Sequence, residues 1–332
     1  MNTSVKLAPD KREQIAQALL AGEDLDGIRK RLIASGASAA SAEYELRRAE
    51  KDPFFQAAAT LQRRIAKRDW ALRIHGRLAL TRNDGLSIRR VEEIEPRDFF
   101  EHFYAANRPV VMTGLVDHWP ALGLWSLDYL ADKVGDAPVE LQGERSSAED
   151  YELAKDRHKR VVRMRDVIAA IRSADQSNDF YVTAYNDTVN KQTLGALWDD
   201  IGDISILRPT GAREGFFWFG PKGTLTPFHH DLTNNLLVQV MGRKRVRMVP
   251  SWEVGRMRNS IHCFSDRSPD EWEHGEDLPP LLECTIGPGD AVFLPIGWWH
   301  HVEALDVSIS MSFTNFSADN DFFSDYPSDS RF

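Results

Sequence analysis

Residues 220–250 read GPKGTLTPFHHDLTNNLLVQVMGRKRVRMVP, and residues 287–305 read GPGDAVFLPIGWWHHVEAL. In the first stretch His229 and Asp231 are two positions apart, so an extended chain points both side chains to the same face. A third nitrogen ligand from a distant strand would complete a set of two histidines and one carboxylate, and His300 is a suitable donor. This set leaves metal positions open and is associated with non-haem Fe(II) oxygenases. The two stretches therefore predict a metal site at His229, Asp231 and His300.

The pair His-x-Asp is weak evidence alone, because a chain with 10 histidines and 50 acidic residues contains one by chance about as often as not. The alternative is a set of histidines at the surface or at strand ends: His229, His230, His300 and His301. The surrounding sequence favours the metal site. Pro227 precedes the pair, an apolar run follows it, and Gly242-Arg243-Lys244 marks a turn into the next strand.

Short β-rich runs separated by Gly, Pro and Asp surround these two stretches. They are PVVMTGL, APVELQG, FYVTAY, GFFWFG, NNLLVQV, KRVRMVP, DAVFLP and VSISMSF. Two helical segments, SLDYLADKVG and MRDVIAAIRSA, lie between the early ones. Many short strands in the C-terminal half predict a mainly β fold, a barrel or a double-sheet jelly roll with flanking helices, over residues 86–332.

Residues 1–85 predict a separate α-helical unit. Apolar residues recur at spacings of three and four in REQIAQALLAG and LDGIRKRLIASG, each of which ends on glycine. The run from Phe54 to Leu80 is long and carries Leu61, Ile65, Leu72 and Ile74, more apolar surface than a free arm should expose. We expect it to form a packed interface, first of all in a homodimer. A module that binds a substrate or leader peptide and a merely packed prefix are the alternatives.

The net charge of −9 is unevenly distributed, with +4 over residues 1–95 and −13 over residues 96–332. An acidic larger domain argues against binding a phosphate backbone and suits a basic peptide or protein substrate, although acidic surfaces also serve solubility. The basic residues of the N-terminal unit are spaced as a solvated helix face, so a nucleic-acid partner is disfavoured. They are Arg63, Arg64, Lys67, Arg68, Arg73 and Arg77.

The cellular location is predicted from what the chain does not contain. No stretch approaches the roughly 18–20 uninterrupted apolar residues of a membrane span, and the start lacks the apolar region of a secretory signal. Cys263 and Cys284 are isolated and form no disulfide framework. We therefore expect a cytoplasmic protein without a membrane partner.

The sequence resembles the JmjC/cupin-8 group of Fe(II)- and 2-oxoglutarate-dependent oxygenases. The resemblance rests on TPFHHD, NNLLVQVMGRK and PIGWWHHVEAL, with further support from RPVVMTGLVDHWPALGLWSLDYLADKVGD and FYVTAYND. Within the group, it is most similar to the asparaginyl hydroxylase that inhibits the hypoxia-inducible transcription factor. The likeness extends from about Ile88 to Phe316. It implies a double-stranded β-helix with His229, Asp231 and His300 as iron ligands, and His230 and His301 directed away.

The resemblance also implies a binding site for the cosubstrate 2-oxoglutarate, with O₂ as the second cosubstrate. Lys244, Thr226 and Tyr181 match positions that bind its distal carboxylate, and a buried carboxylate needs such a cation and hydroxyl donors. The alternatives are a solvated turn lysine beside Arg243 and Arg245, and Tyr185 in place of Tyr181. Asn235 matches a position near the 1-carboxylate. Ser312 replaces an expected second asparagine on the last strand, which puts that contact in doubt.

The activity implied by the resemblance is hydroxylation of an amino-acid side chain in a protein or ribosomally made peptide. The alternative enzyme is a JmjC-type demethylase of N-methyl-lysine or N-methyl-arginine. A third alternative is a non-catalytic cupin that binds a metal or small molecule. Turnover of 2-oxoglutarate separates the enzymes from the binding module, and the mass of the product separates the two enzymes.

Overall fold

The structure is a computed structural model that describes residues 7–147, 151–209 and 214–327. The side chain of Tyr185 lies outside this description. Contacts within the chain divide it into two compact units, Met1–His75 and Gly76–Phe332. This division falls inside a long helix, ten residues before the boundary that the change in sequence pattern predicts.

The N-terminal unit is helical. Helices α1 (Pro9–Leu20), α2 (Leu25–Ala34) and α3 (Ala39–Lys51) enclose a small apolar core. The core consists of Ile15, Ala18, Ile28, Leu32, Ala42 and Leu46. Side chains cap two of the helix starts, since Asp24 accepts a hydrogen bond from the Gly27 amide and Ser38 from the Ser41 amide. Helix α4 (Pro53–Ala79) follows, and Ala79 is its one fully buried residue.

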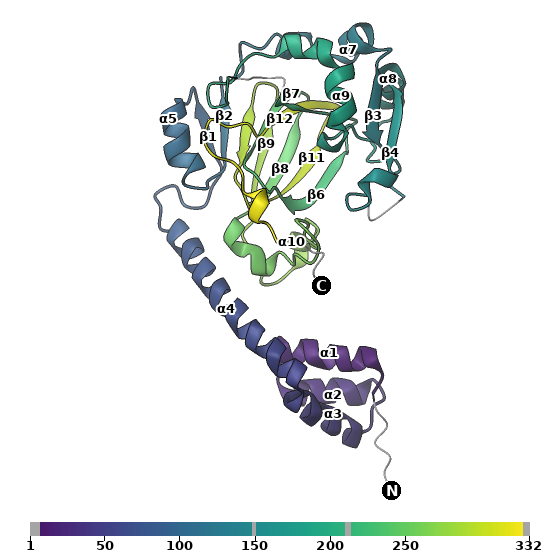
Figure 1. Cartoon of the computed structure of the whole chain (residues 1–332), viewed down its shortest axis with the longest axis vertical. Coiled ribbons are helices and arrows are strands. Elements are labelled where there is room, and N and C mark those ends of the chain that lie inside the picture. Colours follow the sequence, from purple (N-terminus) through teal and green to yellow (C-terminus); the bar gives the residue numbers. More distant parts are fainter. Residues whose placement is uncertain (1–6, 148–150, 210–213, 328–332) are drawn as a thin grey trace. The chain divides into compact units, whose positions relative to one another are not determined.

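The C-terminal unit is built around two β-sheets (Figure 1). The six-stranded sheet has the order β1 (Arg89–Glu92), β2 (Val110–Thr113), β10 (Ala291–Leu294), β7 (Asn235–Met241), β12 (Ser308–Phe313) and β5 (Phe216–Gly220). The four-stranded sheet has the order β6 (Leu225–His230), β11 (Trp299–Ala304), β8 (Lys244–Val249) and β9 (Leu282–Ile286). Only the β1–β2 pair is parallel among the strand pairs described. This is the predicted jelly roll.

Two apolar clusters explain why the strands are so rich in hydrophobic residues. One cluster joins side chains of both sheets, including Leu237 and Val292 from the larger sheet and Met248 from the smaller, and so lies between them. The other covers the opposite face of the six-stranded sheet, where Val238 and Phe293 meet the helices. Strands β7 and β12 are therefore buried on both faces, and β7 is a nearly continuous apolar run. In β12 three buried serines alternate with Ile309, Met311 and Phe313.

Short helices and one two-stranded ribbon complete this unit. The helices are α5 (Pro96–Phe99), a π-helical turn (Phe100–Tyr104), α6 (Ala121–Leu124), α7 (Leu127–Val134), α8 (Met164–Ser173), α9 (Asp187–Thr193) and α10 (Glu271–His274). The ribbon pairs β3 (Pro138–Gln142) with β4 (Lys159–Arg163). The two helices predicted from sequence between the early strands are α7 and α8. No helix in the described part of the chain is long and apolar enough to cross a membrane.

One predicted strand is wrong. FYVTAY makes only isolated bridges, Tyr181 with Gln142 and Val182 with Phe219, and then turns into a 3₁₀ helix at Ala184–Asn186. Thr183 and Asn186 cap that turn reciprocally, which ends the extended segment after three residues. The apolar pattern does not identify β1, β4 or β9 as strands, because charged and polar side chains interrupt each of them.

Candidate active site

The predicted metal ligands come from two neighbouring strands. His229 lies near the end of β6, Asp231 directly follows that strand, and His300 is the second residue of β11. The strands are antiparallel, with His300 directly opposite His229, and the two imidazole centroids are 4.2 Å apart. One ligand atom from each of the three residues lies within 4.8 Å of the others. Sheet register thus brings together residues about 70 positions apart.

An irregularity in β6 sets the direction of its side chains. Between the pairs His229–His300 and Thr226–Val302, β6 has one residue more than β11. Pro227 lies in this β-bulge, on the edge strand of its sheet, where a residue without an N–H group is tolerated. The extra residue allows Thr226 and His229, three positions apart, to line the same pocket. Regular alternation would place them on opposite faces.

Backbone carbonyl groups orient both imidazoles. His229 Nδ1 lies 2.9 Å from the Pro227 oxygen, and His300 Nδ1 lies 3.0 Å from the Trp298 oxygen. Because a carbonyl can only accept, each Nδ1 carries the hydrogen and each Nε2 is left for the pocket. The two Nε2 atoms lie 3.6 and 3.8 Å from the two oxygens of Asp231. Outer hydrogen bonds of this kind orient metal-binding histidines.

The electrostatics of the cluster favour the ligand-ready protonation states of Asp231 and His300. Burial alone would raise the pKa of Asp231, but the hydrogen bond from His229 and the charges of His300 and His229 hold it well below its usual range. Burial lowers the pKa of His300 to about 4. Burial also lowers the pKa of His229, but the neighbouring Asp231 outweighs it and leaves that pKa raised. Asp231 is therefore ionised and His300 neutral at neutral pH, as metal ligands must be.

Lys244 lies at another part of the same pocket. It opens β8, where alternation directs Lys244, Val246 and Met248 inward, and only 2% of Lys244 is exposed. Its ammonium donates a 2.9 Å hydrogen bond to the Tyr181 hydroxyl. Within the described residues no acidic side chain forms an ion pair with it. Burial consequently lowers its pKa from 10.5 to about 7.

The neighbouring cations have other partners. Arg243 forms an ion pair with Asp306 at 2.8 Å, and Arg245 contacts Glu303 at 3.2 Å. Alternation along β8 therefore distinguishes Lys244 from the two arginines that sequence alone left as competitors. A buried ammonium without a counter-ion is costly. A ligand carboxylate would supply the missing negative charge.

The remaining predicted residues line this pocket as well. Asn235 Nδ2 donates to Asp231 Oδ2 at 2.9 Å, while Asn235 Oδ1 is buried and has no hydrogen-bond partner among the described residues. Ser312 Oγ accepts a 2.8 Å hydrogen bond from the indole of Trp218, so its hydroxyl is already engaged on the pocket wall. The aromatic run around Trp218 alternates, with Phe216 and Trp218 on the pocket and Phe217 and Phe219 in the core.

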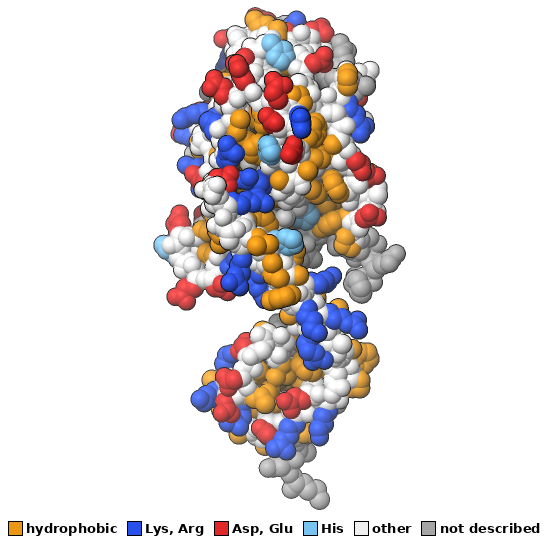
Figure 2. All heavy atoms as spheres, turned by 90° about the vertical axis from the view of Figure 1, so that its left-hand side faces the viewer, with side chains coloured by type: hydrophobic (Ala, Val, Ile, Leu, Met, Phe, Trp, Pro, Cys, Tyr) orange, Lys and Arg blue, Asp and Glu red, His pale blue; other side chains and the backbone are white. Residues whose placement is uncertain are grey.

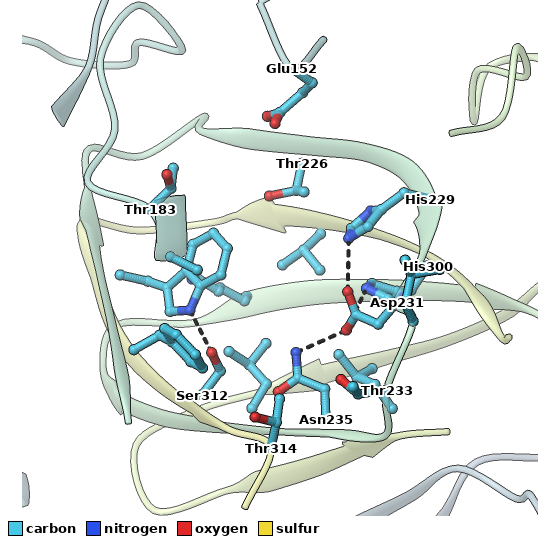
Figure 3. A pocket seen from close by; sticks show the side chains of 18 of the residues that line it. Glu152, Thr183, Thr226, His229, Asp231, Thr233, Asn235, His300, Ser312 and Thr314 are labelled. Atoms are coloured by element: carbon cyan, nitrogen blue, oxygen red, sulfur yellow. Dashed lines mark hydrogen bonds and ion pairs between the residues drawn. The ribbon is translucent and has the colours of Figure 1, made fainter. Parts of the chain in front are cut away.

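All eight predicted site residues thus belong to one cavity of about 200 Å³. Figure 3 shows His229, Asp231 and His300 facing one another on one side, with Ser312 and Thr314 across the pocket. Sequence analysis did not identify several other lining residues: Glu152, Thr183, Leu232, Thr233, Phe264 and Thr314. Glu152 and Phe264 lie in segments without a recognised pattern, and the others lie within or next to patterned segments without a signal of their own, so only the fold places them here.

The adjacent histidines are not among the residues that line this cavity. His230 packs edge-on against Trp299, with ring centroids 4.7 Å apart. His301 packs against Phe228, at 5.5 Å. Each lies next to a predicted ligand, and the alternation of the strand turns each to the other side.

The donor chemistry of the pocket fits the predicted cofactors. Two imidazoles and one carboxylate suit Fe(II) and leave positions open for further ligands. The uncompensated Lys244 ammonium, next to the Tyr181 hydroxyl, fits the distal carboxylate of a dicarboxylic acid such as 2-oxoglutarate. A metal ligand set and an anion-binding cation therefore share one cavity.

Comparison with known proteins identifies the family to which the chain belongs. A protein-family model described as a cupin-like domain matches residues 96–322. The chain is 31% identical over 229 residues to lysine-specific demethylase 8 of Xenopus tropicalis, which covers 65% of this chain and 49% of the relative. It is 30% identical over 244 residues to lysine-specific demethylase JMJ30 of Arabidopsis thaliana. This match covers 69% of this chain and 55% of the relative.

A third relative carries the name of the family itself. The chain is 26% identical over 235 residues to the Jumonji C domain-containing protein 5 of Drosophila melanogaster, covering 65% of this chain and 56% of the relative. The chain thus spans about half the length of the curated relatives it matches. These names agree with a JmjC protein, but they do not support a particular resemblance to the asparaginyl hydroxylase.

Proposed function

Because the chain belongs to the cupin-like domain family, in its JmjC group, we propose that it is an Fe(II)- and 2-oxoglutarate-dependent oxygenase acting on a protein side chain. The observation that carries this proposal is the shared cavity, with the three-ligand cluster and the uncompensated Lys244. When bound, Fe(II) and 2-oxoglutarate supply oxidation of a substrate C–H bond by O₂, with release of succinate and CO₂.

The residues of this chain have three tasks in that reaction. His229, Asp231 and His300 hold the metal, and Asn235 fixes the Asp231 carboxylate. Lys244 and Tyr181 bind the distal carboxylate of 2-oxoglutarate, and Thr226 adds a hydroxyl on the wall nearby. The apolar wall of Trp218, Leu237 and Val302 limits water around the reacting groups.

Two reactions are compatible with this machinery. The names of the relatives favour removal of an N-methyl group from lysine or arginine. Hydroxylation of a side-chain carbon, the main prediction from sequence, is the second candidate, because demethylation is itself hydroxylation at a methyl carbon. A basic side chain suits both, given the net charge of −13 over residues 96–332.

A product assay tests the proposal. The iron-loaded protein, incubated with 2-oxoglutarate and peptides carrying methylated or unmethylated lysine and arginine, is expected to form succinate. Mass spectrometry of the peptides distinguishes the reactions, since demethylation removes about 14 Da and hydroxylation adds about 16 Da. Absence of succinate with every peptide and without peptide, from protein shown to contain iron, would contradict an oxygenase.

We further propose that the chain forms a homodimer through α4. Apolar residues at Phe54, Ala58, Leu61, Ile65 and Leu72 fall on one stripe of the helix at coiled-coil spacing. Phe54 is 87% and Leu61 54% exposed. Figure 2 shows hydrophobic side chains at the surface of the N-terminal unit, among lysines and arginines. A second copy of the same stripe would cover this apolar surface.

Light scattering tests the dimer. The full-length protein is expected at about twice the 37.7 kDa of one chain. The double substitution Leu61→Glu and Ile65→Glu should give monomers, because it places charges in the seam. Arg63→Glu, on the opposite face of α4, is the matched control and should remain dimeric. A monomeric unsubstituted chain, or a dimeric double variant, would contradict an interface on this stripe.

A further inference from the structure

Glu152 supplies a second carboxylate to the active-site cavity. Besides Asp231 it is the one acidic residue among the described residues that line the pocket. Figure 3 shows its carboxylate directed into the pocket, on the side of Thr226 and His229. The described three-residue metal cluster does not include Glu152. The carboxylate is therefore available for a role other than metal binding.

A buried arginine, Arg145, forms an ion pair with Glu152. Arg145 Nη1 lies 3.3 Å from Glu152 Oε1, and 0% of the Arg145 side chain and 9% of the Glu152 side chain are exposed. The guanidinium also donates to the Gln142 side chain and to the Leu225 carbonyl, and it lies 4.3 Å from the Tyr151 ring centroid. These contacts fix Arg145 within the wall. Of this ion pair, Glu152 lines the cavity, so the negatively charged member faces it.

The Glu152 carboxylate suits a cationic ligand rather than 2-oxoglutarate. The 2-oxoglutarate dianion belongs with Lys244, and Glu152 would repel it. A carboxylate has capacity for about four hydrogen bonds, of which the ion pair with Arg145 occupies part. Burial raises the pKa of Glu152, although Arg145 and His229 act in the opposite direction, so a further cation would stabilise its ionised form.

We propose that Glu152 is a specificity-determining residue that accepts a hydrogen bond from the positively charged nitrogen of the substrate side chain, an ammonium or a guanidinium. The inference rests on the proposed function and deepens it, because it names the chemical class of the residue that is oxidised. Glu152 and His229 line the same pocket and interact electrostatically, so a cation held at Glu152 would lie in the cavity that also contains the metal cluster.

The competing explanation is structural, with the ion pair serving only to fix the segment that contains Glu152. The substitution Glu152→Gln separates the two roles. Glutamine keeps the size of the side chain and an oxygen that accepts from Arg145, but it removes the charge that attracts a cation. Glu152→Asp keeps the charge, and it should retain a measurable preference for cationic substrates.

Peptide pools with degenerate flanks and one fixed central residue are the probe. Arginine is compared with citrulline, its neutral near-isostere, and Nε-methyl-lysine with Nε-acetyl-lysine. Fluorescence anisotropy measures the binding of labelled pools in Mn(II) and 2-oxoglutarate, and succinate formation measures turnover with Fe(II). We expect the unsubstituted protein to prefer at least one cationic pool over its neutral partner by roughly ten- to hundredfold. Glu152→Gln should lose most of that preference.

Two further measurements identify the source of any change. The iron content of Glu152→Gln should equal that of the unsubstituted protein, because Glu152 is not a member of the metal cluster. Its affinity for 2-oxoglutarate should not fall, because the substitution removes a charge that repels the dianion. Glu144→Gln, at an exposed glutamate that pairs with Arg160 outside the pocket, is the matched control and should keep the full preference. A preference that survives in Glu152→Gln, or is absent from the unsubstituted protein, would overturn the assignment. Failure to form succinate would instead refute the oxygenase, while anisotropy would still decide the role of Glu152.

Discussion

Replacing Asp231 with alanine is expected to abolish 2-oxoglutarate turnover. Asp231 is the only anionic member of the cluster, and both imidazole Nε2 atoms lie within 4 Å of its oxygens. Removing an outer partner of a metal ligand already costs about 10–100-fold in metal affinity or activity. Loss of the ligand itself should cost more, so succinate formation should fall to the level of protein without iron.

Metal content and turnover measured on the same samples check this expectation. Asp231→Ala should bind iron weakly and make no succinate above background. The matched control is Asp277→Ala, at a 93% exposed carboxylate that pairs with Arg256, and it should keep both properties. Normal turnover in Asp231→Ala would show that these three residues are not the metal site.

Replacing Lys244 with methionine is expected to raise the 2-oxoglutarate requirement roughly ten- to hundredfold, since a hydrogen bond to a charged group contributes about 1.5–3 kcal/mol. Methionine retains the length and packing of the side chain. Because the ammonium has no acidic partner among the described residues, its removal should leave the unfolding free energy unchanged or increase it. Weaker binding of 2-oxoglutarate without a loss of unfolding free energy is the result expected for a residue that contacts the ligand.

The pH dependence of 2-oxoglutarate binding gives a second signature of Lys244. A dianion favours the protonated amine, so binding should raise the pKa of Lys244 above its value of about 7 in the unliganded protein. Below pH 7 the amine is already charged, and the affinity should not change through this group. Above pH 7 the affinity should fall as the free amine loses its proton. In Lys244→Met that fall should disappear.

Quenching of tryptophan fluorescence can follow both the affinity for 2-oxoglutarate and its pH dependence, because Trp218 lines the pocket. Arg243→Gln is the control, since Arg243 pairs with Asp306 at the surface and should not affect the requirement. An unchanged 2-oxoglutarate requirement in Lys244→Met would mean that another cation binds the distal carboxylate. Arg245, whose present partner is Glu303, would be the first to test.

Sequence patterns predicted the fold where one physical effect dominates. The doubly buried strand β7 is apolar along most of its length, β12 alternates serine with large apolar residues, and the buried faces of α7 and α8 follow helical periodicity. The pattern failed for FYVTAY, where a local capping turn outweighs β propensity. It also did not assign β11 as a strand, because two of its first three residues are histidines.

The candidate site was predictable to the extent that its residues lie in specific motifs. The residues of the two metal stretches reach the cavity through strand alternation, which can be read from spacing. The β-bulge at Pro227 could not be predicted, although it places Thr226 and His229 on the same side of β6. Glu152 had no signal at all, since its place depends on Arg145, whose own contacts reach as far along the chain as Leu225.

The register between β8 and β11 has a consequence for the size of the acid that the protein can use. Lys244 is opposite Ala304 and Met248 is opposite His300, so four residues of strand separate the cation from the metal ligand. At a rise of about 3.3 Å per residue, the two backbone positions are on the order of 13 Å apart. Under the proposed function, a diacid must span the gap that remains between their side chains. The hydrogen-bonded register of the two strands, together with the lengths of the side chains at its two ends, then limits which chain lengths of dicarboxylic acid fit.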